Sequence, residues 1–180
     1  MPKKYVKLFS KVDKLHLRKL RNNVNNILKY IARKNPKKNI LDIGPQDYFS
    51  NKKLFKNSNY KSMDINETSI ADFKNDICAN NKKIIADKSF DLIICTEVLE
   101  HTSNPFLAVK EIYRLLKKGG QLHLTTPLNL RIHGPKPDNW RFTDQGLRVL
   151  LQDFKVQKIK ILQSSRYKFP IQHYVISIKI

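Results

Sequence analysis

Apolar runs of strand length and apolar patterns of helical spacing follow one another along most of the chain. The run Leu92–Cys95 stops abruptly at the polar pair Thr96-Glu97. A short, uninterrupted apolar run bounded in this way is typical of a strand buried on both faces of a parallel sheet. Ligands of such sheets bind at the carboxyl ends of the strands, so a ligand edge is expected at Thr96-Glu97.

The residues after this run predict a helix and a further strand. Asn104 is a good N-cap, and Pro105 suits the first helical position. Apolar residues then recur at helical spacing until Lys117-Lys118 and Gly119 close the helix, and Gln121–Thr125 predicts the next strand. Strand, helix and strand make a right-handed βαβ crossover, a unit that indicates a fold but no function.

Four more strands are expected from the same patterns. Asn39–Gly44 is typical of a buried strand that ends in an acid, an apolar residue and a glycine, and Tyr60–Asp64 follows as a second strand that ends in an acid. Lys155–Leu162 and His173–Ile180 alternate between apolar and polar residues. The loop between these last two, Gln163–Gln172, is too short for a crossover helix, so they are expected to pair antiparallel.

An amphipathic helix is expected near the N-terminus, before the helix breaker Asn35-Pro36. Its apolar stripe has a period of 3.6 residues and consists of Leu20, Val24, Ile27, Leu28 and Ile31. Residues 1–37 are expected to form this basic helix, packed on a single domain that spans residues 38–180. The basic residues lie mostly off the stripe, which fits either a solvated face or a lid, substrate or membrane contact.

The net charge of the chain adds polyanions to its possible partners. The chain has 35 Lys and Arg residues against 15 Asp and Glu residues, a formal net charge of +20. Such a charge favours polyanionic partners, so nucleic acid is a possible partner. Lysine is also spread along the whole chain beside abundant Asn and Ile, which the bias of an AT-rich genome alone would produce.

The length, the cysteine content and the hydropathy of the chain indicate its structural class and its compartment. A chain of 180 residues fits one α/β domain. Cys78 and Cys95 are too few for a disulfide framework, which favours the reducing cytoplasm. No stretch approaches the roughly 18 apolar residues that a membrane span needs, and residues 1–20 lack a signal-peptide core. A cytoplasmic protein without a membrane span is therefore expected.

Two residues at strand ends are candidates for ligand contacts. Gly44 directly follows a strand, where a glycine lets the backbone turn tightly against a ligand. Asp64 ends the next strand, where a carboxylate can accept both hydroxyls of a ribose, although it can also be a turn residue before Asn66. Asp76–Cys78 is the only hint of a short third strand end.

A long loop, Thr126–Phe142, leaves the ligand edge and holds the only tryptophan, Trp140. Loops of this length in compact domains are usually functional or disordered, and the aromatic content argues against disorder. Thr143 is then expected to cap a helix whose apolar face includes Leu147.

Together these residues resemble the class I S-adenosylmethionine-dependent methyltransferases, in order, from Asn39 onward. The matching motifs are Leu41–Gly44, Asp64, Ser89–Ile93 with Glu97–His101, and Leu115–Gly120. The string from His133-Gly134-Pro135 to Trp140–Thr143 is similar to a subgroup often found beside glycosyltransferases of surface-polysaccharide pathways. The resemblance implies an α/β, Rossmann-like fold: a seven-stranded, mostly parallel sheet with helices on both faces and an antiparallel last strand.

The resemblance also implies S-adenosylmethionine as the cofactor. Asp64 would hold its ribose, Asp76 and Ile77 would flank its adenine, and Gly44 with Thr96-Glu97 would line its methionine end. The full set of residues expected to bind the cofactor is Asp42, Gly44, Asp64, Ile65, Asp76, Ile77, Thr96 and Glu97.

Acceptor activation is expected at the residues that follow the fourth and fifth strands. A hydroxyl acceptor needs a base within hydrogen-bond reach. His133 is the first candidate for a catalytic role, followed by Asp138 and His101, although His101 can also serve only to cap and pack a helix start.

Two further loop residues are candidates for substrate binding. Trp140 can stack on a sugar or base, or it can anchor the loop to the core. Arg141 can recognise a phosphate or carboxylate of the acceptor, or it can pair with Asp138 or Asp144. No cluster of His, Cys or acidic residues has metal-ligand spacing, so no metal is expected.

Three hypotheses for the function follow. The first is a methyltransferase that acts on a small molecule or glycan, and the second is an RNA methyltransferase or RNA-binding protein, which the charge favours. The third is a scaffold that has lost its cofactor. It is favoured by Gly44-Pro45-Gln46, because the family usually has Gly-x-Gly at these positions.

Overall fold

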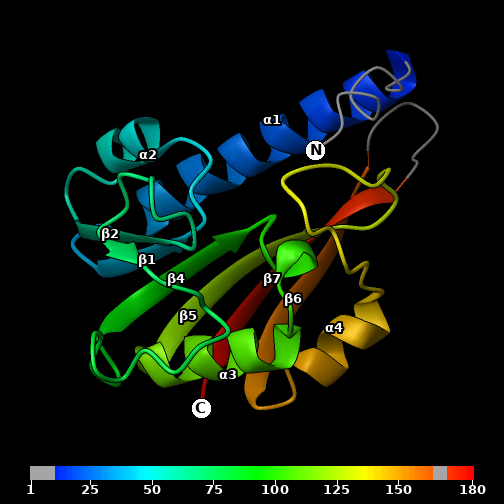
Figure 1. Cartoon of the computed structure of the whole chain (residues 1–180). Coiled ribbons are helices and arrows are strands. Elements are labelled where there is room, and N and C mark those ends of the chain that lie inside the picture. Colours follow the sequence, from blue (N-terminus) through cyan, green and yellow to red (C-terminus); the bar gives the residue numbers. More distant parts are fainter. Residues whose placement is uncertain (1–10, 164–169) are drawn as a thin grey trace.

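Seven strands form one sheet within residues 11–163 and 170–180, the part of the chain that the computed structural model describes (Figure 1). In the order of the sheet they are β3 (Phe73–Lys74), β2 (Asn59–Asp64), β1 (Asn39–Ile43), β4 (Phe90–Thr96), β5 (Leu116–Pro127), β7 (Pro170–Lys179) and β6 (Phe154–Gln163). Strands β3 to β5 pair in parallel, whereas β7 runs antiparallel to both of its neighbours. This confirms the expected fold class.

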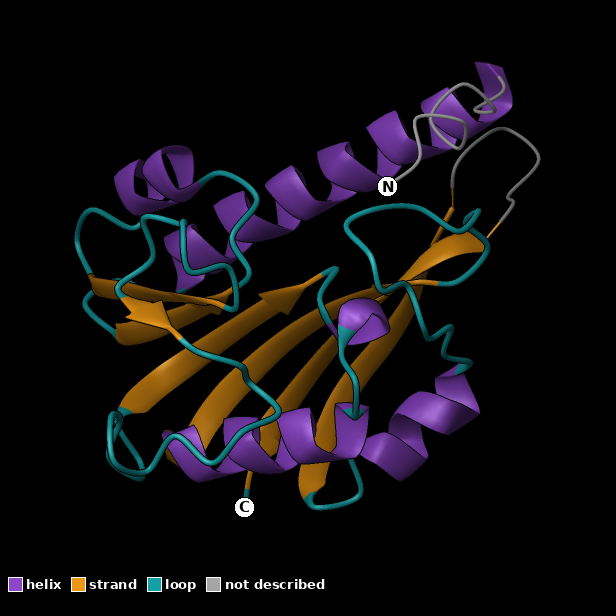
Figure 2. Ribbon diagram, in the orientation of Figure 1, coloured by secondary structure: helices purple, strands orange, loops and turns teal. Residues whose placement is uncertain are grey.

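Helices cover both faces of the sheet (Figure 2). Helix α1 (Lys11–Lys34) and the short α2 (Tyr48–Leu54) lie on one face, and α3 (Pro105–Leu115) and α4 (Asp144–Leu150) lie on the other (Figure 1). A single turn of 3-10 helix, η2 (Leu99–His101), follows β4. None of the helices in the described residues has the length and apolar content that a membrane span requires.

The apolar stripe of α1 is the reason why this helix packs on the sheet. Leu20, Val24 and Ile31 are buried in one core cluster with Ile40 of β1 and Ile94 of β4. The alternate residues of β4 face a second core cluster, which α3 and α4 complete. Because successive side chains of a strand point to opposite faces, β4 is apolar on both sides.

The expected start of α3 is confirmed, but its end is wrong. The side chain of Asn104 caps the helix by accepting hydrogen bonds from the amides of Phe106 and Leu107. The helix ends at Leu115 rather than near Gly119, because Leu116 already pairs with Phe90 as part of β5.

The third strand was expected too late in the chain, at Asp76–Cys78. The structure places β3 at Phe73–Lys74, and Asp76–Cys78 form a turn instead. The side chain of Asp76 accepts a hydrogen bond from the amide of Cys78 at 2.8 Å, an Asx turn that competes with strand pairing.

The antiparallel pairing of β6 with β7 is confirmed, although β7 begins at Pro170 rather than at His173. Most of the expected loop between them, residues 164–169, lies outside the described part of the chain. Thr143 caps α4 as expected, since its hydroxyl accepts from the amide of Gly146.

Replacing Asp42 with asparagine is expected to flatten the pH dependence of stability between pH 4 and 7. Burial raises the pKa of Asp42 from 3.8 to about 6, even though Tyr60 and Asn51 donate hydrogen bonds to its carboxylate. The folded chain therefore binds this proton more tightly than the unfolded chain, and stability falls as the pH rises from about 4 to above 6. The loss is on the order of 3 kcal/mol. Urea unfolding at several pH values measures it, and parallel curves for both proteins would contradict the expectation.

Candidate functional site

A cavity of about 620 Å³ opens at the edge of the sheet where β1, β2 and β4 end. Its walls come from the segments after these strands, from α1, and from the loop between β5 and α4. The lining residues used below are Leu17, Arg21, Gly44, Asp64, Ile65, Asp76, Ile77, Glu97, Val98, His101 and His133. The ligand edge inferred from Thr96-Glu97 therefore coincides with a real cavity.

Gly44 stands where the chain turns away from β1. Its φ is +61°, and a Cβ atom at this position would lie 2.6 Å from Cγ2 of Val98. Both the backbone conformation and the contact with Val98 exclude a side chain here. The turn after β1 is therefore held close to the turn after β4.

Asp64 occupies the end of β2 and lines the cavity with its neighbour Ile65. Its Oδ1 atom accepts a hydrogen bond from the amide of Asn66 at 2.8 Å, which fixes the orientation of the carboxylate. Asp76 and Ile77 lie on the same side of the cavity wall, after β3. With Gly44 and Glu97, the structure thus brings six of the residues expected to bind a cofactor to this cavity.

Two other residues expected to contact a cofactor do not line the cavity. Asp42 and Thr96 are buried within the sheet. Asp42 instead holds α2 and β2 against β1, because its Oδ2 accepts from Asn51 at 2.9 Å and from Tyr60 at 2.6 Å. A contact of Asp42 or Thr96 with the cofactor stays a prediction.

Glu97 carries a buried carboxylate at the cavity wall. One oxygen accepts a hydrogen bond from Nε2 of Gln172 at 2.8 Å, and Asn23 of α1 donates in turn to the amide oxygen of Gln172. The other oxygen, Oε2, is buried without a hydrogen-bond partner. Burial raises the pKa of Glu97 to about 7. This side chain therefore has an unused acceptor at the cavity.

The loop between β5 and α4 is fastened to the turn η2. The backbone amides of Asn139 and Trp140 both donate to the carbonyl of Glu100, at 2.7 and 3.1 Å. The indole N–H of Trp140 donates to the carbonyl of Thr102 at 2.9 Å, and Nδ1 of His101 lies 2.7 Å from the carbonyl of Pro137. These bonds explain why so long a loop has a defined path.

Arg141, Asp138 and His133 form a polar chain within this loop. The guanidinium of Arg141 donates to both oxygens of Asp138 and also to backbone carbonyls, including that of Leu130. Oδ2 of Asp138 also accepts from the amide of His133 at 2.8 Å and lies 3.1 Å from its Nδ1. These contacts hold the pKa of Asp138 below its usual value. Asp138 is therefore an ionised group that orients both neighbours.

The candidates for acceptor chemistry fall into two groups. The rings of His101 and His133 meet edge to face, with their centroids 5.1 Å apart, and both residues line the cavity. Asp138, Trp140 and Arg141 stand behind them and do not line it. Trp140 anchors the loop and Arg141 pairs with Asp138, two of the alternatives that the sequence left open. Direct contact of Trp140 or Arg141 with an acceptor stays a prediction.

Two other elements contribute residues that were not expected at the site. Leu17 and Arg21 of α1 line the cavity, and Gln172 of β7 reaches Glu97. The only available signal was position: Arg21 lies off the apolar stripe of α1, and Gln172 directly precedes a predicted strand. Neither feature points to a site without knowledge of which elements meet.

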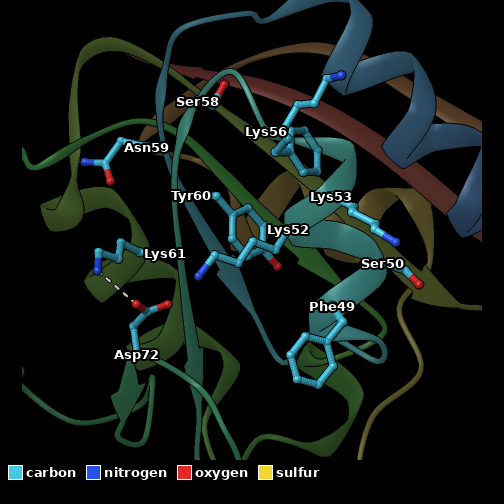
Figure 3. A pocket seen from close by; sticks show the side chains of 11 residues that line it. Phe49, Ser50, Lys52, Lys53, Lys56, Ser58, Asn59, Tyr60, Lys61 and Asp72 are labelled. Atoms are coloured by element: carbon cyan, nitrogen blue, oxygen red, sulfur yellow. Dashed lines mark hydrogen bonds and ion pairs between the residues drawn. The ribbon is translucent and has the colours of Figure 1, made fainter.

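A second hollow, of about 780 Å³, lies against α2 and β2 (Figure 3). Lysine side chains surround it, namely Lys52, Lys53, Lys56 and Lys61. Its acid, Asp72, is already paired with Lys61 at 2.9 Å and accepts from the amide and hydroxyl of Ser62. The described contacts therefore give this hollow a basic rim, but no unused buried polar group that would mark a ligand.

A family model, one curated relative and one solved structure that resemble this chain all carry the name methyltransferase. A family model described as "Methyltransferase domain" matches residues 14–166. Probable polyketide synthase 26 of Dictyostelium discoideum is 29% identical over 138 residues, which cover 71% of this chain and 5% of that protein. Ubiquinone biosynthesis O-methyltransferase of Pseudomonas aeruginosa is 28% identical over 102 residues, or 49% of this chain and 44% of the relative. The chain thus spans less than half the length of either curated relative.

Solved structures share the fold. A SAM-dependent methyltransferase of Methanosarcina mazei has a TM-score of 0.60 at 18% sequence identity. The match covers 81% of this chain and 94% of that one. At this identity the likeness concerns the arrangement of the strands and helices.

Proposed function

Because the chain belongs to the methyltransferase domain family, whose cofactor is S-adenosylmethionine, we propose that it methylates a hydroxyl group of a small molecule or glycan-type acceptor. One observation carries this proposal. A single cavity has Gly44 and Asp64 in its wall, and in the same wall stand the imidazoles of His101 and His133. Cofactor and acceptor would thus meet in one space.

The residues present fit S-adenosylmethionine. The cavity volume lies within the usual range for ligand sites, about 300–1,000 Å³. Gly44 keeps the turn after β1 free of a side chain, and the carboxylate of Asp64 would accept the ribose hydroxyls. The unpartnered Oε2 of Glu97 offers an acceptor to an ammonium group. The substitution of Pro45-Gln46 after Gly44 leaves this cavity open, which favours an active enzyme over a scaffold.

The residues of the chain would serve mainly to align the acceptor with the methyl group. When bound, S-adenosylmethionine supplies a methyl group on a positively charged sulfur. The chain would hold the acceptor oxygen in line with that methyl group and keep water away, because displacement depends mainly on proximity and orientation. Leu17 and Arg21 of α1 stand in the cavity wall and would help to exclude solvent.

Activation of the acceptor is assigned to the two imidazoles. Burial lowers the pKa of His133, so the ring stays neutral and can accept a proton. Asp138 faces its Nδ1 atom and leaves Nε2 as the free nitrogen. The relative from Pseudomonas is an O-methyltransferase by name, which supports an oxygen acceptor.

RNA is the second candidate acceptor. The net charge of +20 and the lysines around the hollow beside α2 favour a polyanion. Binding of RNA through these lysines would weaken steeply with salt, because it would release counterions.

Methyl transfer from labelled S-adenosylmethionine tests the proposal. The acceptors to be offered are phenols, sugar nucleotides, oligosaccharides and RNA. We expect label in a hydroxyl compound, and a loss of about 100-fold or more in His133→Ala. His123→Asn is the matched control, since His123 is a buried histidine that bonds to Tyr174 instead. Transfer to RNA alone would favour the second candidate. Absence of both cofactor binding and methyl transfer would favour the scaffold.

A further inference from the structure

Three potential ligand atoms converge beside the cavity. One atom each from Glu100, His101 and His133 lies within 4.8 Å of the other two. Ligands held about 2.0–2.2 Å from one metal ion are roughly 3 to 4 Å apart, so small side-chain rotations would bring all three to bonding distance. Glu100 and His101 come from η2, whereas His133 comes from the loop fastened to it.

Glu100 lacks the partners that a buried acid requires. Its side chain is fully buried, and neither carboxylate oxygen makes a hydrogen bond. Nε2 of His101 lies 3.6 Å from its Oε1 atom. Leaving such oxygens unpaired costs several kcal/mol, unless the group is neutralised or binds a cation.

Both imidazoles point a free nitrogen away from their own hydrogen-bond partners. Nδ1 of His101 lies 2.7 Å from the carbonyl of Pro137, which can only accept, so a neutral ring carries its proton on Nδ1. Nδ1 of His133 faces the carboxylate of Asp138 at 3.1 Å and the carbonyl of Arg131 at 3.3 Å. In both rings the lone pair is left on Nε2. This is the arrangement that metal-binding histidines have, with an oxygen atom holding the other nitrogen.

Acidic side chains gather around the cluster. Three acidic side chains meet here, namely Glu97, Glu100 and Asp138, and their neighbouring cation is Arg141. Both carboxylate oxygens of Asp138 already accept hydrogen bonds from the guanidinium of Arg141. Burial raises the pKa of Glu97 to about 7 and the pKa of Glu100 well above its usual value, so both carboxyl groups hold their protons readily without a metal. A divalent cation bound to Glu100 would displace its proton.

We propose that Glu100, His101 and His133 bind a divalent transition-metal ion of the zinc, cobalt or manganese class. Two imidazoles and one carboxylate are a ligand set that these metals prefer. Both histidines line the cavity, which provides an entry path and leaves open positions for a further ligand.

The metal would give the site a second way to activate a hydroxyl. This step rests on the proposed function. A hydroxyl bound at an open position has a lower pKa, so its proton leaves to solvent while the metal stabilises the oxygen anion. The oxygen lone pair then forms the new C–O bond as the C–S bond breaks and its electron pair returns to sulfur. With the ion bound, His133 would be a ligand, and solvent would replace its imidazole as the acceptor of the hydroxyl proton.

Calorimetric titration of the metal-stripped protein with zinc chloride tests the site, without cofactor or acceptor. Cobalt chloride is used in parallel, because its visible spectrum reports nitrogen and oxygen ligands. We expect one ion per chain and affinity weaker by about 100-fold or more in Glu100→Gln and His133→Asn. In Asp138→Asn we expect the affinity for the ion to be weaker by only about 10-fold, since this residue only orients His133.

His123→Asn is again the control, since it removes a buried imidazole far from the cluster in the sheet. Circular dichroism checks that each variant folds, and zinc is expected to raise the melting temperature of the unaltered protein but not of Glu100→Gln. Equal affinity in Glu100→Gln and the unaltered protein, or no binding at all, would overturn the metal site. Either result would leave the methyltransferase proposal standing, since cofactor binding is measured separately.

Discussion

Alanine in place of Gly44 is expected to destabilise the fold by about 2–5 kcal/mol and to prevent cofactor binding. Two costs add. A left-handed backbone costs a residue with a Cβ atom about 1–2 kcal/mol, and the φ of Gly44 is +61°. Over-packing costs about 1–3 kcal/mol more, because the new Cβ would lie 2.6 Å from Cγ2 of Val98. Urea unfolding measures the stability, and calorimetry with S-adenosylhomocysteine measures the binding.

Gly119 provides a matched control for this experiment. Its φ is +76°, but a Cβ atom there meets nothing within 4 Å. Gly119→Ala should therefore show only the backbone cost and keep normal cofactor binding. Combining Gly44→Ala with Val98→Ala should recover the over-packing part, because the second change removes Cγ2. Equal losses in Gly44→Ala and Gly119→Ala would show that the contact with Val98 has no energetic effect.

Replacing Asp64 with alanine is expected to weaken binding of S-adenosylmethionine by about 100-fold or more while leaving the fold intact. Hydrogen bonds from two ribose hydroxyls to a carboxylate are each worth about 1.5–3 kcal/mol. Asp64 ends β2 at the cavity wall, and the one described hydrogen bond of its carboxylate is local, accepted from the amide of Asn66. Calorimetric titration with the cofactor gives the change in Kd.

Glu67→Ala is the control for Asp64→Ala. Glu67 is an exposed acid three residues further on, outside the cavity lining, so its removal lowers the negative charge of the same turn without touching the site. Asp64→Asn should bind with intermediate affinity, since it keeps an acceptor but loses the charge. Unchanged binding in Asp64→Ala would place the ribose elsewhere in the cavity.

Local sequence signals located most elements of the fold. Asn104-Pro105 and Thr143 begin helices where expected, because a cap depends on a few neighbouring residues. The helix α2 was not anticipated: a seven-residue helix, capped by Asp47, has too few residues for a periodic signal. The strand β3 was misplaced because two residues carry no alternation, and the turn at Asp76 competes with them.

The sequence by itself determined the parallel strands β1, β2, β4 and β5, the starts of α3 and α4, and the ligand edge at the end of β4. Hydrophobic periodicity reports how deeply each residue is buried and so reveals the strands, whereas a few neighbouring capping residues set the helix starts. Only the tertiary structure decided that Arg141 pairs with Asp138 and that His133 lies beside Glu100 and His101. Those contacts depend on the path of one long loop. Hydrogen bonds to η2 fix that path, and no pattern of apolar residues encodes them.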